Sequence, residues 1–143
     1  MTPPGNTTTG LVFEQMVAPA LKRGEYSWEK PKTPIGARPG GGRHYVDLVV
    51  NKGTGPKILV SLKWQQKSGT AEQKVPFEVI SLAEALQNNP HEFGRAYLVL
   101  GGPGWTLRDF YTGGGLDKYL RGCEQVRILD METFLARAND GAL

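Results

Sequence analysis

The chain has 143 residues, of which 39% are hydrophobic and 22% are charged. These values are typical of one globular domain with a buried core, and the length calls for no second domain. No apolar run approaches the roughly 18 residues of a membrane span, and the start lacks the blocks of a signal peptide. We therefore expect a cytoplasmic protein with no membrane partner. The single cysteine, Cys123, excludes an internal disulfide, and the two histidines argue against a structural zinc site.

Formal charge is unevenly distributed along the chain. Residues 1–70 carry ten positive and four negative side chains, whereas residues 71–143 carry seven positive and ten negative ones. A basic half is what a polyanion-binding site needs, because phosphate contacts supply most of the non-specific affinity for nucleic acid. The alternative is a solvated surface with no partner.

The first half of the chain predicts one helix and three strands. Apolar residues at helical spacing predict a helix over 10–22, and a short strand follows over 26–30. Residues 31–42 are rich in Gly, Pro and basic side chains and predict a loop. Two runs of β-type residues, 45–50 and 57–64, then predict a hairpin.

After residue 70 the predicted elements alternate between helices and strands. In chain order they are a helix over 71–88, a strand over 96–100, a weak helix over 107–120, a strand over 126–129 and a helix over 130–138. The run from Thr70 to Gln73 has the form of a capping box. This order predicts an α/β fold with a mixed central sheet flanked by helices. We expect a single domain over 10–143, preceded by a flexible terminus over 1–9.

Two charged residues occupy interior positions of the predicted hairpin. Side chains alternate along a strand, so Ser61 and Lys63 share one face with Leu59. Asp47 stands among apolar neighbours in the preceding strand. A carboxylate and an ammonium are costly there unless they are paired, partly wet or holding a metal. The alternative to a functional site is a simple ion pair between Asp47 and Lys63 across the strands.

The order of these residues resembles a known family. A helix with a glutamate, a strand with Asp47, a strand with Ser61-x-Lys63, then a helix and a strand are similar to the PD-(D/E)xK nuclease superfamily of restriction enzymes and Holliday-junction resolvases. The resemblance covers residues 10–100. It implies a Mg²⁺ site, with Mn²⁺ as a substitute, held by Asp47 and by a carboxylate two residues before Lys63. The backbone carbonyl of Leu62 is a further ligand that the resemblance implies.

Two positions depart from the family pattern. Val46 replaces a proline, and Ser61 stands where Glu or Asp is expected, which removes a metal ligand. Some restriction enzymes that resemble this pattern take the missing carboxylate from the following helix, and here the candidate is Glu78. At 100° per residue, Glu78 falls about 60° from the centre of the apolar stripe of its helix, at the edge of the buried face. Glu72 is a second candidate, at the other edge.

Two further residues belong to the expected reaction centre. Glu14, on the first predicted helix, resembles the extra glutamate of resolvase-like members, which implies that it binds the metal or orders a ligand water. Mg²⁺ prefers carboxylate and water oxygens, and it stabilises the charge of a phosphodiester transition state while lowering the pKa of water. Lys63 beside the ion would orient or deprotonate the attacking water.

Basic and polar residues near the expected site are candidates for contact with DNA. They are Arg38, Arg43, His44, Gln65, Gln66, Lys67 and Lys74. The loop that carries the first three either grips DNA phosphate or is a flexible linker between elements.

These expectations converge on a Mg²⁺-dependent DNA endonuclease of restriction, homing or junction-resolving type. Such small members usually act as homodimers or homotetramers, because one active site cuts one strand. Phe77 and Ile80 lie off the apolar stripe of their helix, as an interface or as residues buried within the same domain. The alternative function is a non-catalytic nucleic-acid-binding module that kept the scaffold and lost the metal site through Ser61.

Overall fold

The computed structural model describes residues 10–143, and the terminus expected over residues 1–9 lies outside them. Five strands form one mixed sheet in the order β1-β4-β5-β6-β7. Their bounds are β1 Ser27–Glu29, β4 Leu48–Asn51, β5 Lys57–Trp64, β6 Phe93–Gly101 and β7 Val126–Asp130. Pairing is antiparallel from β1 through β4 to β5, and parallel from β5 through β6 to β7. The mixed sheet predicted from the sequence is confirmed.

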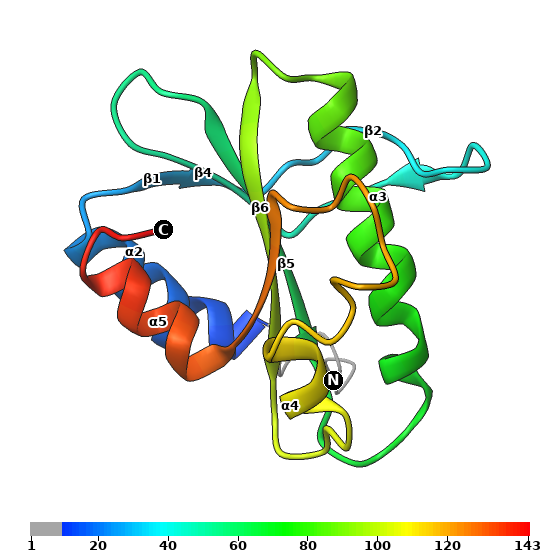
Figure 1. Ribbon diagram of the computed structural model, residues 1–143. Helices are drawn as coiled ribbons and strands as arrows, with labels where there is room; N and C mark the ends of the chain where they lie inside the picture. Colours follow the sequence, from blue (N-terminus) through cyan, green and yellow to red (C-terminus); the bar gives the residue numbers. More distant parts are fainter. Residues whose placement is uncertain (1–9) are drawn as a thin grey trace.

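Helices cover both faces of this sheet (Figure 1). The first helix and α5 lie against one face, and α3 lies against the other. In chain order the helical segments are residues 10–12, the π-helical η1 (Phe13–Val17), α2 (Ala18–Arg23), the 3-10 helix η2 (Thr70–Lys74), α3 (Val75–Asn88), α4 (Arg108–Thr112) and α5 (Met131–Asn139). Within residues 10–143, none of these helices has the length and apolar content needed to cross a membrane.

The alternation of side chains along β5 divides the core into two clusters. Val60 packs in one cluster with Phe134 of α5, whereas Leu59 packs in the other with Leu82 of α3. Lys63, four residues on from Leu59, therefore points to the α3 side of the sheet. The two faces of β5 are those expected from the sequence.

The first helix continues through Pro19 and ends at Arg23, close to its predicted end. Pro19 lies in the first turn of α2, directly after the π-helical segment η1. A proline is tolerated in a first turn because its missing N–H is not needed there. The wider π-helical turn shifts the hydrogen-bonding pattern before the proline, so the helix does not break.

Residues 31–42, expected as a loop, contain part of a second, two-stranded sheet. β2 (Gly36–Ala37) pairs antiparallel with β3 (Arg43–His44). The Arg38 N–H closes the turn between them by donating to the Gly42 carbonyl at 2.6 Å. Two-residue strands carry no hydropathy period, so the sequence pattern could not predict them. The resulting hairpin projects beside α3 (Figure 1).

Two predicted helices have different boundaries. The helix expected over 107–120 is reduced to α4, because the glycines from Gly113 onward end it. The capping box before α3 does not form. The 3-10 helix η2 occupies residues 70–74 and begins without a side-chain cap. The Glu72 carboxylate accepts the backbone N–H of Leu107. α3 then starts with Pro76 in its first turn, where a proline is tolerated.

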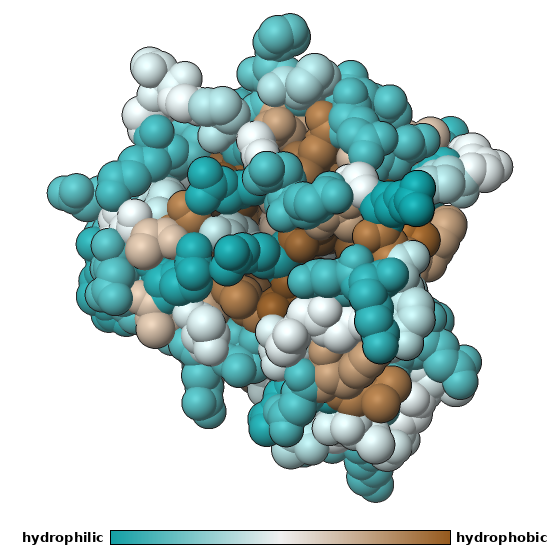
Figure 2. Space-filling view, viewed as in Figure 1, coloured by the Kyte–Doolittle hydropathy of each residue, from teal (hydrophilic) through white to brown (hydrophobic). Residues whose placement is uncertain are grey.

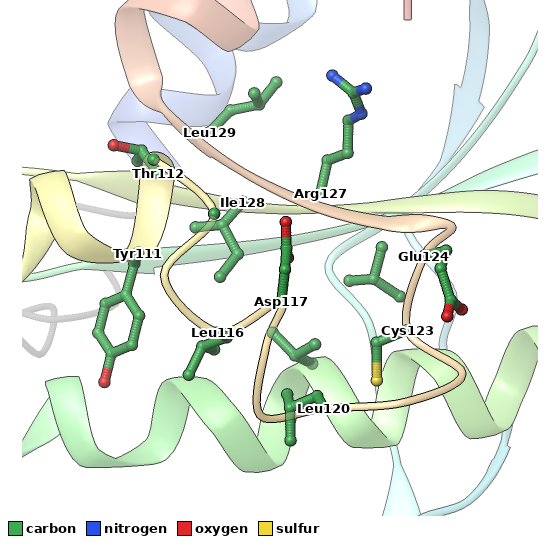
Figure 3. A pocket seen from close by; sticks show the side chains of 14 residues that line it. Tyr111, Thr112, Leu116, Asp117, Leu120, Cys123, Glu124, Arg127, Ile128 and Leu129 are labelled. Atoms are coloured by element: carbon green, nitrogen blue, oxygen red, sulfur yellow. The ribbon is translucent and has the colours of Figure 1, made fainter.

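A cavity of about 460 Å³ lies between β7, α3 and the segment that joins α4 to β7 (Figure 3). Its wall mixes apolar side chains such as Leu116 and Ile128 with the charged Arg127. Figure 2, viewed as in Figure 1, shows apolar residues gathered in the middle of this face of the molecule, bordered by polar ones. Neither Asp47 nor Lys63 lines this cavity, so it is separate from the predicted site.

Candidate active site

The Glu78 carboxylate is the centre of a buried hydrogen-bond network. Glu78 lies in the first turn of α3 and is 3% exposed. Its Oε2 accepts a hydrogen bond of 2.7 Å from the Ser61 hydroxyl on β5 and lies 3.1 Å from Nε2 of His44 on β3. Its Oε1 accepts a hydrogen bond of 2.6 Å from Nη1 of Arg38. Three segments of the chain therefore meet at one carboxylate.

These donors keep Glu78 ionised. Burial alone would raise its pKa, because the charged form loses water. The hydrogen bonds from His44, Arg38 and Ser61, together with the charge of Lys63, outweigh burial and lower the pKa of Glu78 from its usual 4.5 to about 2. The Glu78 carboxylate is thus ionised at neutral pH although it is buried.

Asp47 lies just before β4, beside the end of β5. Its backbone N–H donates to the Val60 carbonyl at 3.1 Å, and its Oδ2 accepts the Leu62 N–H at 2.6 Å. The side chain reaches solvent, yet the surrounding protein removes enough water to raise its pKa above the usual 3.8. The Leu62 hydrogen bond and the Lys63 charge act against that rise, and the charge of Glu78 adds to it. The two carboxylates are therefore close enough to repel one another.

Lys63 is half-buried and acts on both carboxylates through its charge. Among residues 10–143, the pairs within 4 Å are Arg38 with Glu78, His44 with Glu78, and Arg108 with Asp109. Lys63 belongs to none of them. A simple ion pair between Asp47 and Lys63, the alternative weighed from the sequence, is thus not formed, and the ammonium stands near two acids without closing on either.

The oxygen donors at this place fit a hard divalent cation. Within residues 10–143, no cluster of three or more His, Cys, Asp or Glu side chains could hold a metal. The carboxylates at this place are those of Asp47 and Glu78, which act on one another through their charges. The N–H and C=O of one strand residue point to the same edge, so the Leu62 carbonyl lies on the Asp47 side of β5. Mg²⁺ keeps several waters and is usually held by one or two carboxylates. Asp47, Glu78 and the Leu62 carbonyl supply oxygens of this kind, and in the structure Arg38 occupies Oε1 of Glu78.

Comparison with known proteins identifies the fold. The PD-(D/E)XK nuclease superfamily domain matches residues 6–142 of the chain. The chain belongs to this superfamily. It is also similar to the crystal structure of AF1548, a protein of unknown function, with 13% sequence identity and a TM-score of 0.48. That similarity covers 80% of this chain and 54% of the other, so the chain spans about half the length of AF1548. No curated protein matches.

The Ser61–Glu78 contact lies at a motif position of the superfamily. The superfamily motif places an acid two residues before its lysine, and here that position is Ser61. The serine hydroxyl points at Glu78, so a carboxylate from α3 stands beyond the short side chain of Ser61. The structure therefore brings Asp47, Glu78 and Lys63 together on the α3 side of β5.

The other two acidic candidates lie elsewhere. Glu72 accepts the Leu107 N–H at 2.5 Å, which lowers its pKa, and its backbone carbonyl accepts from the Tyr111 hydroxyl. These contacts tie η2 to α4 and give Glu72 a structural role. Glu14 is exposed on η1. The start of its helix lies near the site, because Val12, two residues before Glu14, lines a small hollow together with Lys63. A role for Glu14 at the site stays a prediction.

The residues expected to contact DNA divide into three groups. Arg43, Gln66, Lys67 and Lys74 are exposed. Arg38 is partly exposed and bound to Glu78. His44 and Gln65 are buried, and the Gln65 side chain donates to the Gly104 carbonyl. Direct contact with DNA does not fit these last two, because the protein already covers their polar groups.

Sequence reasoning missed that Arg38 and His44 bind Glu78. His44 is buried in the two-residue strand β3, next to the exposed Arg43. A strand of that length carries no hydropathy period, so the sequence held no signal that separates the two side chains. The basic composition of the segment instead suggested a phosphate contact.

Proposed function

We propose that the protein is a Mg²⁺-dependent endonuclease that hydrolyses phosphodiester bonds in DNA. The observation that carries the proposal is the hydrogen bond from Ser61 to Glu78, because it accounts for the acid that the motif lacks. Family membership supports a nuclease, and the basic amino half of the chain supports a nucleic-acid substrate.

Asp47, Glu78 and the Leu62 carbonyl are the residues that would hold Mg²⁺, with Mn²⁺ as a substitute. When bound, the ion would supply positive charge that stabilises the phosphodiester transition state. Asp47 suits this task, because ligation relieves the cost of its partly desolvated negative charge. Glu78 suits it because it stays ionised across the physiological pH range.

Lys63 is assigned to the attacking water. Its ammonium lies near both carboxylates without pairing with them, so its N–H donors remain available for a water and for a phosphate oxygen. A positioned donor of this kind fixes the direction of attack and faces the negative charge that develops on phosphorus oxygens. Partial burial strengthens both effects.

The exposed residues Arg43, Gln66, Lys67 and Lys74 are proposed to contact the DNA backbone. Gln66 and Lys67 directly follow β5, so they would hold the strand that is cut close to Lys63. Phe77, 46% exposed on α3, is proposed to lie in a homodimer or homotetramer interface.

A second candidate function is a non-catalytic DNA-binding module. The observation that favours it is the Arg38–Glu78 ion pair, since the charge of Glu78 is already balanced without a metal. The two functions differ in whether phosphodiester bonds of the bound DNA are hydrolysed.

Incubation with supercoiled plasmid, linear duplex and four-way junction DNA tests the proposal. Each substrate is incubated with Mg²⁺, with Mn²⁺ and with EDTA. We expect cleavage of at least one substrate with either metal and none with EDTA. Binding of DNA without cleavage under every metal would favour the binding module. Cleavage in EDTA would contradict the metal requirement.

A further inference from the structure

The two oxygens of the Glu78 carboxylate are held by donors of different kinds. Oε2 lies among donors that cannot leave without unpacking the core, because Ser61 is 2% exposed and His44 is fully buried. Oε1 is held by Arg38, whose side chain is 25% exposed. One oxygen is thus fixed by the interior, and the other is bound by a group that reaches solvent.

The hairpin that carries Arg38 is lightly held at its tip. Its ladder has only two rungs, Gly36 with His44 and Ala37 with Arg43. The tip contains Gly40 and Gly41, both with positive φ, and a side chain added at either would meet nothing within 4 Å. Figure 1 shows this hairpin projecting past α3. The Arg38 backbone is held in the turn by hydrogen bonds with Gly42 and Gly41, but its side chain is 25% exposed. The side chain can therefore turn away from Glu78 while His44 stays in place.

The Arg38 guanidinium and a divalent cation compete for the same charge. Both are positive, and both would bind a carboxylate whose Oε2 already serves two donors. A DNA phosphate offers Arg38 an equivalent partner, because guanidinium binds phosphate and carboxylate with the same planar set of donors. Exchange of one anion for the other would leave Oε1 open.

We propose that Arg38 couples DNA binding to metal binding: it holds Glu78 Oε1 in the free protein and moves to a backbone phosphate of bound DNA, which opens Oε1 to the divalent cation. This inference rests on the proposed function, since it assigns Glu78 to the metal. It makes metal and DNA bind cooperatively, and the coupling is reciprocal because each ligand raises the affinity for the other by the same factor. It also weakens the binding of a divalent cation by the protein without DNA.

Equilibrium binding of Mn²⁺, followed by the electron paramagnetic resonance signal of the free ion, tests the coupling without measuring cleavage. The parent, Arg38→Gln and Arg127→Ala are compared, first without DNA. Arg38→Gln removes the competing charge but keeps an N–H donor for Oε1, which protects the fold. Arg127→Ala removes an exposed arginine beside the separate cavity, so it is the control for loss of one positive charge. We expect Mn²⁺ to bind about tenfold more tightly to Arg38→Gln than to the parent or to Arg127→Ala.

The second arm repeats the titrations with a saturating short duplex, with Lys63→Ala added to all three proteins so that the duplex stays intact. DNA should tighten Mn²⁺ binding to the protein that retains Arg38 and leave the Arg38→Gln protein almost unchanged. Equal or weaker Mn²⁺ binding by Arg38→Gln without DNA would overturn the coupling, because Arg38 would then only position Glu78. If neither the parent nor Arg38→Gln binds Mn²⁺, with or without DNA, the proposed function fails and the coupling fails with it.

Discussion

The Ser61 hydroxyl on β5 donates a 2.7 Å hydrogen bond to Oε2 of Glu78 in the first turn of α3. The serine hydroxyl brings no carboxylate to the strand, and its hydrogen bond puts the Glu78 carboxylate of the helix next to it. In the proposed site, Glu78 supplies the acid that the motif lacks at Ser61. The start of α3 also suits a carboxylate, because a helix N-terminus carries partial positive charge. Ser61 and Glu78 therefore bring a carboxylate near the charge of Lys63, although the strand itself carries serine at that position.

The first prediction concerns this transfer of the acid. Glu78→Gln should abolish Mg²⁺-dependent cleavage and nearly preserve DNA binding, since an amide keeps the shape but loses the charge that holds a hard cation. Glu84→Gln, on the same helix, is the control and should cut like the parent. The exchange Ser61→Glu with Glu78→Ser should restore part of the activity in a plasmid-nicking assay. Full activity of Glu78→Gln would remove Glu78 from the site.

The second prediction concerns Asp47 and Lys63. Asp47→Ala and Lys63→Ala should each slow cleavage by about 1000-fold or more, which corresponds to roughly 4 kcal/mol in barrier height. Lys57→Ala, at the opposite end of β5, is the control and should leave the rate unchanged. Single-turnover cleavage rates provide the measurement, and circular dichroism checks the fold. A parent-like rate in either site variant means that the reaction centre lies elsewhere.

The third prediction concerns acid stability. The pKa of Glu78 is lowered from 4.5 to about 2 in the folded state, so its stabilisation is fully present above pH 4.5 and is lost as the pH falls toward 2. The shift corresponds to roughly 3 kcal/mol. Urea unfolding from pH 7 to pH 3 should therefore show a steeper loss of stability for the parent than for Glu78→Gln. Parallel curves for the two proteins would contradict the buried ionised state of Glu78.

The fourth prediction concerns DNA affinity. Binding should weaken steeply as salt increases, because phosphate contacts release counterions. Arg43→Ala should lower the affinity and reduce the slope of log affinity against log salt by about 1. Arg127→Ala, beside the cavity at β7, is the control for loss of one exposed arginine. Fluorescence anisotropy across a salt series measures both, and a flat salt response would point to a different substrate.

Much of the fold follows from local patterns in the sequence. The alternation in β5 predicted that Ser61 and Lys63 share a face with Leu59, and the α3 cluster confirms that face for Leu59. Helical spacing put Glu78 at the edge of the buried face, and its 3% exposure agrees. Such features depend on neighbours in sequence, which is why a pattern contains them.

The surroundings of Glu78 could not be predicted in the same way. His44 and Arg38 reach it only because a two-rung hairpin folds against α3, a contact between segments more than thirty residues apart in the chain. The same holds for Glu72, whose partner Leu107 lies 35 residues away. A hydrophobic period gives no information about which polar groups meet across such distances.

The last prediction concerns the free energy of unfolding of the metal-free protein, which the charge of Asp47 lowers. The pKa of Asp47 is raised above 3.8 in the folded state, chiefly by loss of water around the carboxylate. A raised carboxyl pKa means that ionisation of Asp47 destabilises the fold once the pH exceeds that value, and that this cost vanishes below pH 3.8. Asp47→Asn removes the charge and keeps an oxygen that accepts the Leu62 N–H, so in EDTA at pH 7 it should be more stable than the parent.

Urea unfolding of both proteins in EDTA at pH 7 and pH 3, and in Mg²⁺ at pH 7, provides the measurement. The advantage of Asp47→Asn should shrink at pH 3, where Asp47 is largely protonated in both the folded and unfolded parent. Added Mg²⁺ should stabilise the parent alone, by about 2.7 kcal/mol when the ion is present at 100 times its dissociation constant, because a ligand that binds only the folded state adds its binding energy to stability. If Asp47→Asn is instead less stable than the parent in EDTA at pH 7, the carboxylate is a structural anchor for Leu62 rather than a charge kept for a cation.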